Sequence, residues 1–489
     1  MENLLYRRQF VLSPKELNDY SAWDKYYLLD KYVLYAHPDL VQTEHADRKK
    51  RIILLGDMYD PMNKTYNNLD IISRVIKNDN LNKIIESTFQ YAGRFAIIVV
   101  IDSLVYIFND ASASRKVFYT TENESVWCAS QPHVLAEYCN IPRTENKKAL
   151  SFYQSEKFHS HDKVNIVNNT IYDSIKQILP NHYLDVQNKK HVRFWPTKKN
   201  KLVSLNEGVE QGAKILSGII SSANERYELM MAVTAGNDTR LLLAASRSVS
   251  ENIFYYINKI PRYHEKHQDL VIPTRMFNKI GLKYNILEFS KEVNDEEFKK
   301  IYSQNNLFAH ERNLPLIYNV YYKRFPNKIN MPGRFSDIAR NFFNTYRKNI
   351  TPELLAKFWD YAGIEYVIDE YGKWLSTAGD IAKKYNYNIL ELFNWEERNG
   401  NLYTAFQVDK DIAQEEFTPY NCRRLMEVFL SVPNKYRDIH TNIYFRAMIK
   451  HLWPELVTIP FNPNFEKYLS FYLKKLKIYW IIRRFSRGW

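Results

Sequence analysis

Cysteine is scarce in this 489-residue chain, which holds three. An odd number at these spacings fits neither a disulfide framework nor a zinc site, so we expect Cys128, Cys139 and Cys422 to be buried small hydrophobes or incidental thiols. Glycine is scarce as well, with 13 residues, where an average chain contains about 7%. Each glycine that remains is therefore expected where a side chain would not fit.

Long apolar segments are also missing. The longest apolar run covers residues 95–101, whereas a helix that crosses a bilayer needs about 20 such residues. The first residues, MENLLYRR, show neither the apolar stretch nor the small-residue cleavage site of a signal peptide. We therefore expect a cytoplasmic protein without a spanning helix.

Basic residues are in excess, since 68 Lys and Arg against 55 Asp and Glu give a net charge of +13. They are dispersed among acidic residues, except in residues 189–201 and in the C-terminal segment. No zinc finger, basic zipper or glycine-aromatic RNA-binding signature occurs. The charge distribution therefore argues against nucleic-acid binding. The composition, with 45% hydrophobic and 25% charged residues, is that of a globular protein.

The N-terminal region has the pattern of β-structure. Residues 89–120 read as a buried apolar strand, a polar turn at 102–103 and an aromatic-rich strand, which predicts a hairpin. Residues 170–196 again read as strand, turn and strand, with a break at 180–181. The basic stretch 197–201 has no periodic pattern and is interpreted as a linker.

Beyond the linker, helices and strands alternate, which predicts an open parallel sheet with right-handed crossovers. From residue 351 on, the chain is expected to be mostly helical. The predicted helices cover residues 205–223, 241–248 and 269–280, and the predicted strands cover 229–234, 253–257 and 284–288.

A loop with the sequence TAGNDTR, residues 234–240, lies between a predicted strand and a predicted helix. Such a loop places backbone N–H groups and a helix N-terminus at the carboxyl edge of a parallel sheet, where open α/β folds bind ligands. Gly236 permits close backbone approach, Thr234 and Thr239 offer hydroxyl groups, and Asp238 could hold Mg²⁺. Two interpretations are open from these residues alone: a phosphate-binding loop, or a tight turn in which Asp238 caps the helix.

The loop resembles the Ser-Gly-Gly-x-Asp-Ser pyrophosphate loop of asparagine synthetase and its relatives, the β-lactam synthetases and lasso-peptide cyclases. Residues 331–337 (MPGRFSD) are similar to the second glycine-rich loop of that family. Weaker similarities follow the family order along the chain. They lie at 93–95 (GRF), 110–119, 127–130 (WCAS), 170–195, 395–398 (WEER), 418–421 (TPYN) and 430–433 (LSVP).

This resemblance implies a fold that combines α/β and α+β architecture. Residues 1–196 would form an αββα sandwich like that of the N-terminal-nucleophile (Ntn) amidotransferases, here without glutaminase activity. Residues 202–463 would form an N-type ATP pyrophosphatase domain, of the adenine nucleotide α-hydrolase type, with a parallel sheet and a helical C-terminal part. Residues 464–489 would be a basic amphipathic tail. Family members adenylate a carboxylate with ATP and then let an amine displace AMP.

The resemblance also implies ATP and Mg²⁺ as cofactors and assigns their ligands by motif position. Asp238 and Asp337 would bind Mg²⁺, and they would act in catalysis together with Arg334 and Lys450. The residues expected to contact the nucleotide are Val233, Thr234, Gly236, Asn237, Asp238, Thr239, Ile257, Pro332 and Gly333.

The sequence departs from the family at the glutaminase position. Glutamine-hydrolysing members begin at a cysteine exposed by removal of the initiator methionine, because the thiol and its own α-amine form the nucleophile and the base. Position 2 of this chain is Glu2. We therefore expect a protein that does not hydrolyse glutamine.

Further departures affect the synthetase loops. Ala235 replaces the first glycine of the pyrophosphate loop, and Arg334 and Ile338 stand where the family has glutamates. The late lysine of the family falls at Asn442. Either its role moves to another cation, with Arg334, Arg340 and Lys450 as candidates, or the second half-reaction differs.

The sequence thus favours an AMP-forming carboxylate–amine ligase that uses ammonia or an amine of a larger substrate, such as a cell-surface glycan or peptide precursor. A degenerate scaffold or nucleotide-binding protein is the alternative from another class. An ATP pyrophosphatase that acts on RNA is a third, which the Ntn-like half disfavours. No sequence feature identifies the carboxylate, the amine or the oligomeric state.

Two other features have competing interpretations. His264, His267 and Asp269 resemble a metal cluster, but their spacing favours a solvated helix start; the HSHD sequence at 159–162 is interpreted as surface histidines. The segment from Phe465 to Trp489 interleaves Lys and Arg with large apolar residues. It is expected either to lie on an anionic membrane face, at the inner side of the membrane, or to dock on the protein.

Overall fold

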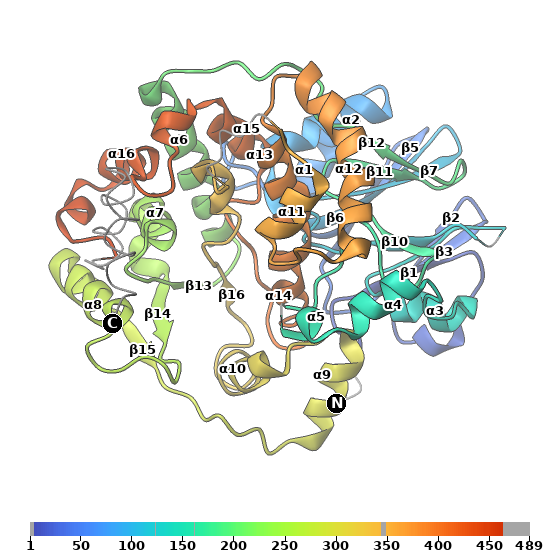
Figure 1. Cartoon of the computed structure of the whole chain (residues 1–489), viewed down its shortest axis with the longest axis horizontal. Helices are drawn as coiled ribbons and strands as arrows, with labels where there is room; N and C mark the ends of the chain where they lie inside the picture. Colours follow the sequence, from blue (N-terminus) through green and yellow to red (C-terminus); the bar gives the residue numbers. More distant parts are fainter. Residues whose placement is uncertain (1–3, 123, 161, 344–348, 463–489) are drawn as a thin grey trace.

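The computed structural model describes residues 4–122, 124–160, 162–343 and 349–462. Two antiparallel sheets lie on one side of the molecule and a parallel sheet lies on the other, with the helices of residues 352–408 between them (Figure 1). Glu2, His161 and the predicted amphipathic segment 465–489 lie outside the described residues. The expectations about these residues stay predictions.

Each antiparallel sheet has six strands. The first contains, in spatial order, β10 (Ile175–Gln177), β8 (Phe118–Thr120), β9 (Trp127–Ala129), β1 (Phe10–Ser13), β3 (Tyr32–Ala36) and β2 (Asp24–Leu28). The second contains β12 (Lys190–Arg193), β11 (His182–Asp185), β7 (Leu104–Asn109), β6 (Ala92–Ile101), β5 (Lys50–Tyr59) and β4 (Gln42–Ala46).

The two antiparallel sheets pack face to face. Successive residues of β6 alternate between two cores: Ile98 joins the cluster between the sheets, and Ile97 and Val99 join the cluster on the outer face. This alternation follows from the two-residue period of a strand. Helix α1 (Asn68–Val75) covers β4 and β5, and α3 (Pro132–Cys139) covers β8 and β9. The layers are therefore helix, sheet, sheet and helix.

The predicted hairpin is confirmed, because β6 and β7 pair antiparallel around residues 102–103. Asp102 and Ser103 both have positive φ angles, of 52° and 60°, as the mirror-image turns of tight hairpins require. The second predicted strand pair differs. β10 belongs to the first sheet and β11 to the second, so the chain crosses between the sheets at residues 180–181.

The parallel sheet has four strands, in the order β15 (Asn285–Leu287), β14 (Phe254–Asn258), β13 (Leu229–Ala232) and β16 (Ile329–Asn330). All three of its pairings are parallel, which confirms the predicted open α/β sheet. Helix α7 (Asn237–Ala245) connects β13 to β14, and α8 (Gln268–Ile280) connects β14 to β15, whereas α6 (Leu205–Asn224) precedes β13. The structure is thus a mixed α/β fold with two antiparallel sheets and one parallel sheet.

The remaining described chain is mostly helical after residue 351, as predicted. Every described helix is too short or too polar to cross a lipid bilayer. The other helices are α2 (Leu81–Ser87), α4 (Lys147–Gln154), α5 (Glu156–Ser160), α9 (Glu296–Asn305), α10 (Leu314–Leu316), α11 (Pro352–Phe358), α12 (Glu365–Lys384), α13 (Ile389–Phe393), the π-helix η8 (Asn394–Tyr403), α14 (Thr404–Val408), α15 (Arg423–Ser431) and α16 (Ile443–Leu452).

A buried cluster of charges joins the antiparallel half to the helical region. Arg94 of β6 contacts Asp411 through two nitrogens, at 2.5 and 2.8 Å, and Arg115 contacts Glu415 at 3.1 Å. Arg8 lies 3.7 Å from Glu415. These pairs hold the two halves together.

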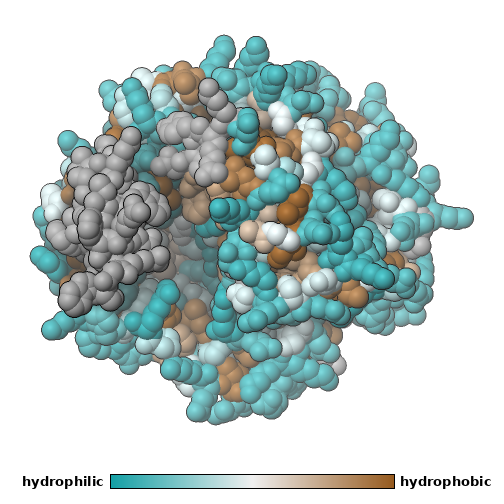
Figure 2. Space-filling view, in the orientation of Figure 1, coloured by the Kyte–Doolittle hydropathy of each residue, from teal (hydrophilic) through white to brown (hydrophobic). Residues whose placement is uncertain are grey.

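On the face shown in Figure 2, polar side chains predominate, and hydrophobic ones gather mainly near α11 and α12. Cys128 and Cys422 are buried and Cys139 is partly buried, and none of the three forms a disulfide bond within the described residues. The expected burial is thus confirmed for Cys128 and Cys422.

Candidate functional site

The loop predicted at residues 234–240 lies at the carboxyl edge of the parallel sheet. β13 ends at Ala232, and α7 begins at Asn237 with Gly236 as its N-cap. The helix thus starts four residues earlier than predicted, because Asn, Asp and Thr are well suited to a first turn. The second loop, residues 331–337, follows β16, the parallel neighbour of β13. Adjacent parallel strands therefore deliver both loops to one edge.

The two loops touch each other. A Cβ atom added to Gly333 would lie 3.2 Å from Thr239 Cγ2 and 3.3 Å from Asp238 Cβ, so a side chain there would crowd the first loop. Ser336 Oγ of the second loop donates to Asp238 Oδ1 at 2.6 Å. The structure thus brings together two segments that are about a hundred positions apart in the sequence.

The start of α7 offers free N–H groups. Earlier N–H groups of the loop have internal acceptors: that of Thr234 donates to Thr239 Oγ1 (3.0 Å), that of Ala235 to Asp269 Oδ1 (2.9 Å), and that of Gly236 to Thr234 Oγ1 (3.3 Å). The N-cap of α7 is a glycine, and no side-chain hydrogen bond from the described residues caps the helix. The first-turn N–H groups, which begin at Asn237, are therefore available to an anion.

Two carboxylates lie beside this helix start. Asp337 is only 2% exposed, and its Oδ2 accepts from Arg398 Nε at 2.8 Å. Burial raises the pKa of Asp337 in spite of the neighbouring Arg398 and Arg340, and the charge of Asp238 raises it further. Asp238 forms an ion pair with Arg340 at 3.2 Å. The site thus holds two acidic and two basic groups.

One oxygen of this group has no protein partner. Asp337 Oδ1 is buried and accepts no hydrogen bond from the described residues. A buried carboxylate oxygen without a partner is costly, so its position indicates an additional ligand. No cluster of three or more His, Cys, Asp or Glu among the described residues could hold a metal.

Arg334 is held by an acidic partner. Its Nη1 donates to Glu416 Oε1 at 2.6 Å, and Glu416 is fully buried. Burial would raise the pKa of Glu416, but Arg334 and Lys410 lower it overall. Arg334 stands where the resembled family has a glutamate. Its positive charge is balanced by Glu416, which lies 82 positions later in the chain.

The remaining predicted site residues differ in their burial and in their distance from the two loops. Val233 is buried, and its carbonyl accepts a hydrogen bond from Tyr284 at 2.6 Å. Ile257 is buried on β14, and Pro332 is partly buried at the start of the second loop. Lys450 is exposed in the last turn of α16, and no hydrogen bond or ion pair joins it to either described loop.

The last residue of the first loop has a structural role. Arg240 is fully buried and donates to the carbonyls of Ile459 at 2.6 Å and Pro460 at 2.8 Å. Its guanidinium lies 3.8 Å from the centroid of the Phe461 ring. Arg240 therefore fastens residues 459–461 to α7.

The second loop contains a non-glycine residue in the left-handed region. Phe335 has a φ of 67°, which is unfavourable for a bulky side chain. It stands where the resembled family has its second glycine. The ring is buried and lies 5.9 Å from that of Tyr403, edge to face. Burial and packing of the ring therefore offset the energetic cost of the strained backbone.

Sequence reasoning missed three residues that contact the loops. Asp269, interpreted as local to its own helix, accepts the Ala235 N–H. Arg398 binds Asp337, and Tyr420 donates to the Asp238 carbonyl at 2.8 Å. Arg398 and Tyr420 lie within the segments 395–398 and 418–421, which resemble the family. This resemblance was the only feature of the sequence that pointed to these two residues.

The histidines near residue 265 belong to a helix start. His267 is the N-cap of α8, and its Nδ1 accepts from the Asp269 N–H at 3.2 Å. Its ring stacks on Tyr263 with centroids 4.0 Å apart. This confirms the predicted helix start.

The chain before β1 also bears on the expected chemistry. Residues 4–9 precede the strand and bind the opposite half: Asn305 of α9 donates to the Leu4 carbonyl at 2.7 Å, and Gln9 donates to the Asn305 carbonyl at 2.8 Å. The head of β1 is therefore an internal peptide that carries no free α-amine.

No protein-family model matches this chain, and no curated protein matches it. Two solved structures align at 9% identity. One is the allosteric regulatory enzyme of purine biosynthesis, over 62% of this chain and 75% of that one, with a TM-score of 0.26. The other is glutamine phosphoribosylpyrophosphate amidotransferase from B. subtilis, complexed with ADP and GMP, over 58% and 86%, with a TM-score of 0.25. TM-scores this low support no assignment of fold or function.

Proposed function

We propose that the chain is an ATP-dependent, AMP-forming carboxylate–amine ligase whose phosphate site is the start of α7. One observation carries the proposal: the uncapped first turn of α7 lies beside two carboxylates at the carboxyl edge of a parallel sheet. Helix N-termini bind phosphate through their N–H groups and their dipole. The resemblance to asparagine synthetase-like ligases rests on the same two loops.

The carboxylates fit Mg²⁺. Magnesium is usually held by one or two carboxylates together with substrate phosphates, so a cluster of three acids is not needed. Asp337 Oδ1 is a buried oxygen without a partner among the described residues. Asp238 is close enough for its negative charge to raise the pKa of Asp337. When bound, the ion would neutralise charge on the phosphate oxygens. Asp238 and Asp337 would hold it.

Cations of this chain supply the remaining positive charge. Arg340 and Arg398 are already placed by Asp238 and Asp337, so little entropy is lost when they bind a phosphate oxygen. The hydroxyls of Thr234 and Thr239 lie 3.0 Å apart and can donate to the same anion. Arg334 is a third candidate, since it is 22% exposed in its side chain and is oriented by Glu416.

The amine would come from a source other than glutamine hydrolysis by this chain. An Ntn glutaminase needs a nucleophile with its own free α-amine at the head of the first strand. Here residues 4–9 occupy that position and are bound to α9. Ammonia or an amine on a larger substrate, such as a glycan or peptide precursor, would then displace AMP.

A nucleotide-binding protein without catalysis is the second candidate. It is favoured by a specific observation: each of the two carboxylates already has a guanidinium partner, at 3.2 Å for Asp238 and 2.8 Å for Asp337. In such a protein the arginines would remain on the carboxylates and ATP would bind without being cleaved.

Binding and cleavage of ATP test both candidates. Calorimetry with Mg²⁺ and ATP should show binding, which Asp238→Ala weakens about 100-fold, the equivalent of ~3 kcal/mol. The control is Asp380→Ala, which removes an exposed carboxylate from α12. Exchange of labelled pyrophosphate into ATP, screened over carboxylates, should then reveal adenylation. Binding without exchange for any carboxylate would favour the second candidate, formation of ADP would exclude the ligase, and absence of binding would contradict both.

A further inference from the structure

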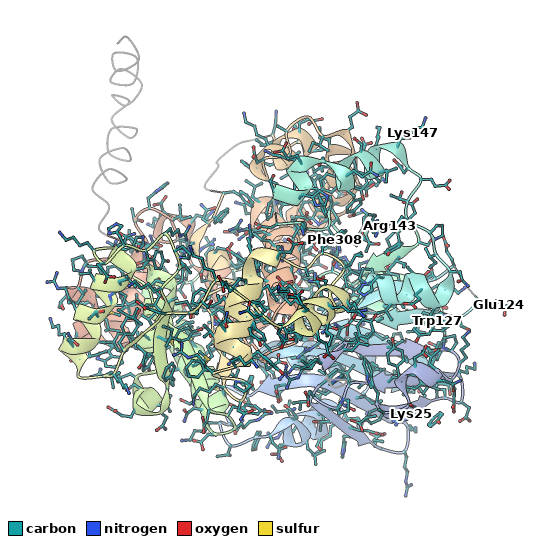
Figure 3. The ribbon with its side chains drawn as sticks, turned by 90° about the horizontal axis from the view of Figure 1, so that it is seen from below. Lys25, Glu124, Trp127, Arg143, Lys147 and Phe308 are labelled. Atoms are coloured by element: carbon teal, nitrogen blue, oxygen red, sulfur yellow. The ribbon has the colours of Figure 1, made fainter. Side chains whose placement is uncertain are left out.

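A small cavity of about 50 Å³ lies between the antiparallel half and the helical region. None of the residues that line it belongs to the two loops. Figure 3 places Phe308, one of these residues, near the middle of the molecule. The lining residues that carry polar side chains are Lys116, Gln131, Lys163, Asn165, Asn306 and Asn401.

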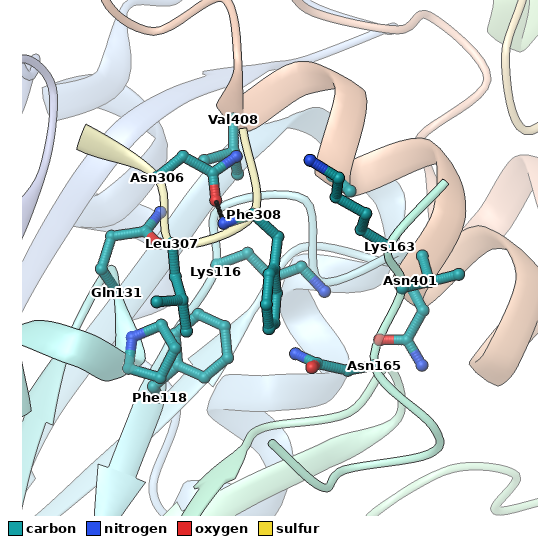
Figure 4. Close-up of a pocket in the computed structure, with 13 residues that line it drawn as sticks. Lys116, Phe118, Gln131, Lys163, Asn165, Asn306, Leu307, Phe308, Asn401 and Val408 are labelled. Carbon is teal, nitrogen blue, oxygen red and sulfur yellow. Dashed lines mark hydrogen bonds between the residues drawn. The ribbon is translucent and has the colours of Figure 1, made fainter. Parts of the chain in front are cut away.

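Lys116 is the most unusual of these residues. Its side chain is buried, and its Nζ donates to the Gln177 side-chain oxygen at 3.1 Å and to the Gly400 carbonyl. Both acceptors are neutral. The side chains of Lys116 and Asn165 point toward the same space beside the ring of Phe308 (Figure 4).

Acidic groups near Lys116 are engaged elsewhere. Glu397 accepts from Tyr371 (2.9 Å), from Asn401 (2.9 Å) and from the Val167 N–H (2.9 Å). Asp110, the other acid that acts on Lys116, accepts several hydrogen bonds from its own loop. Burial lowers the pKa of Lys116 to about 7 although both acids oppose the shift. Among the described residues, the ammonium group therefore has no direct anionic partner.

A second cation and an unpartnered amide complete the lining. Lys163 Nζ donates to the Ala309 carbonyl at 3.2 Å, which is again a neutral acceptor. Asn165 Oδ1 is buried and has no hydrogen-bond partner among the described residues. Among the described residues, the lining includes a buried lysine, a partly buried lysine and no Asp or Glu. An anion beside a buried ammonium group offsets the cost of its desolvation.

We infer that this cavity binds a small oxyanion, a carboxylate or phosphate group, between Lys116 and Lys163. A cavity needs roughly 10–15 Å³ for each water molecule, so this one admits an ion of a few heavy atoms. Phe118, Val164 and Phe308 contribute apolar walls, which lower the local dielectric constant and strengthen the interaction. Asn165 can accept a hydrogen bond from a protonated phosphate oxygen or from an ammonium group on the same ligand.

The inference does not depend on the proposed ligase function. The lining residues come from residues 116–165 on one side and 306–408 on the other. A bound oxyanion therefore joins the two halves of the molecule, and its binding is expected to raise the unfolding temperature of the protein.

Calorimetry with sodium acetate and, separately, sodium phosphate tests the inference and distinguishes the two sources of the oxyanion. An anion raises the pKa of Lys116, so binding at pH 8 should be accompanied by uptake of up to about one proton per anion. Titrations in buffers of different ionisation enthalpy measure this uptake. Lys116→Met should weaken binding at least 10-fold and abolish the uptake.

Lys148→Met is the matched control, since Lys148 is exposed and pairs with Glu365 and Asp369. It should leave binding and proton uptake unchanged. If Lys116→Met does not fold, Lys163→Gln should still weaken binding while proton uptake persists. Failure of the wild-type protein to bind either anion at tens of millimolar, or equal binding by the wild type and a folded Lys116→Met, would overturn the inference.

Discussion

Asp110 in the antiparallel half and Asp337 in the parallel half follow strands, and both are 2% exposed. Their partners differ. Asp110 accepts from the N–H groups of Phe95, Ser112, Ser114 and Arg115 and from the Asn421 side chain. Asp337 accepts from Arg398 on one oxygen, and its other oxygen has no hydrogen-bond partner among the described residues. Equal burial thus accompanies different surroundings: Asp110 stabilises a loop, and Asp337 is the residue proposed to bind a ligand.

The arginine pairs of the two halves differ in the same way. Arg94 and Asp411 are 2% and 7% exposed in their side chains, and two hydrogen bonds join them. Arg340 and Asp238 are 18% and 27% exposed and lie 3.2 Å apart. Buried pairs are costly to break, whereas exposed pairs contribute little. The first pair is therefore structural, and the second can rearrange around a ligand.

The largest effect is expected from breaking the buried pair. Arg94→Met should lower the free energy of unfolding by about 3–5 kcal/mol, because it removes the guanidinium that forms two hydrogen bonds with the buried Asp411. Arg340→Met should lower it by less than about 1 kcal/mol. Urea denaturation of both variants measures the difference. Equal losses would contradict the distinction between the two pairs.

The second largest loss of stability is expected at low pH, where the carboxylate of Glu415 at the interface between the two halves becomes protonated. Burial would raise the pKa of Glu415, but Arg115, Arg94 and Arg8 lower it to about 2. A carboxylate whose pKa is depressed on folding stabilises the protein above its unfolded pKa, near 4.3, and loses that contribution as the pH falls toward 2. The expected loss between pH 5 and 2 is on the order of 3 kcal/mol.

Glu415→Gln separates this residue from the other acids. The variant should be less stable at pH 7, and its stability should fall less steeply with acid than that of the wild type. Denaturation curves at several pH values measure both slopes. Parallel slopes would show that Glu415 does not titrate in this range.

The smallest change in stability is expected at Asp337. Because burial raises its pKa, the charged form is disfavoured in the fold, so Asp337→Asn should change the free energy of unfolding by less than about 1 kcal/mol or increase it. Asp110→Asn, of the same chemistry and burial, should cost about 2 kcal/mol through lost charge-assisted hydrogen bonds. Thermal unfolding compares the two variants. A large loss at Asp337 would identify it as a structural residue.

Regular patterns of the sequence predicted the regular parts of the fold. The β6–β7 hairpin and the parallel strands β13, β14 and β15 follow from apolar runs and turn residues. A loop between a strand and a helix near residue 234 was predicted correctly from its small and polar residues, but residues 237–240 of the predicted loop belong to α7. The assignment of β10 to a different sheet from β11 could not be predicted, since the local sequence of a short strand does not specify which sheet it joins.

The partners of the site residues could not be predicted from local patterns. Arg398 reaches Asp337 across 61 positions, and Tyr420 reaches Asp238 across 182. Such contacts depend on how the helical region folds back over the parallel sheet. Lys116 shows the same limit, because a lysine in a polar, basic stretch gives no sign that it will be buried against Gly400.

Gly333 also determines how the two loops can move. Since a methyl group there would press on Thr239 and Asp238, a side chain at position 333 would push the second loop away from α7, and Ser336 holds this loop to Asp238 through a hydrogen bond. A displacement of either loop is therefore transmitted to the other. Through Arg240, α7 passes the same displacement to residues 459–461. The site and this distant segment thus form one mechanical unit.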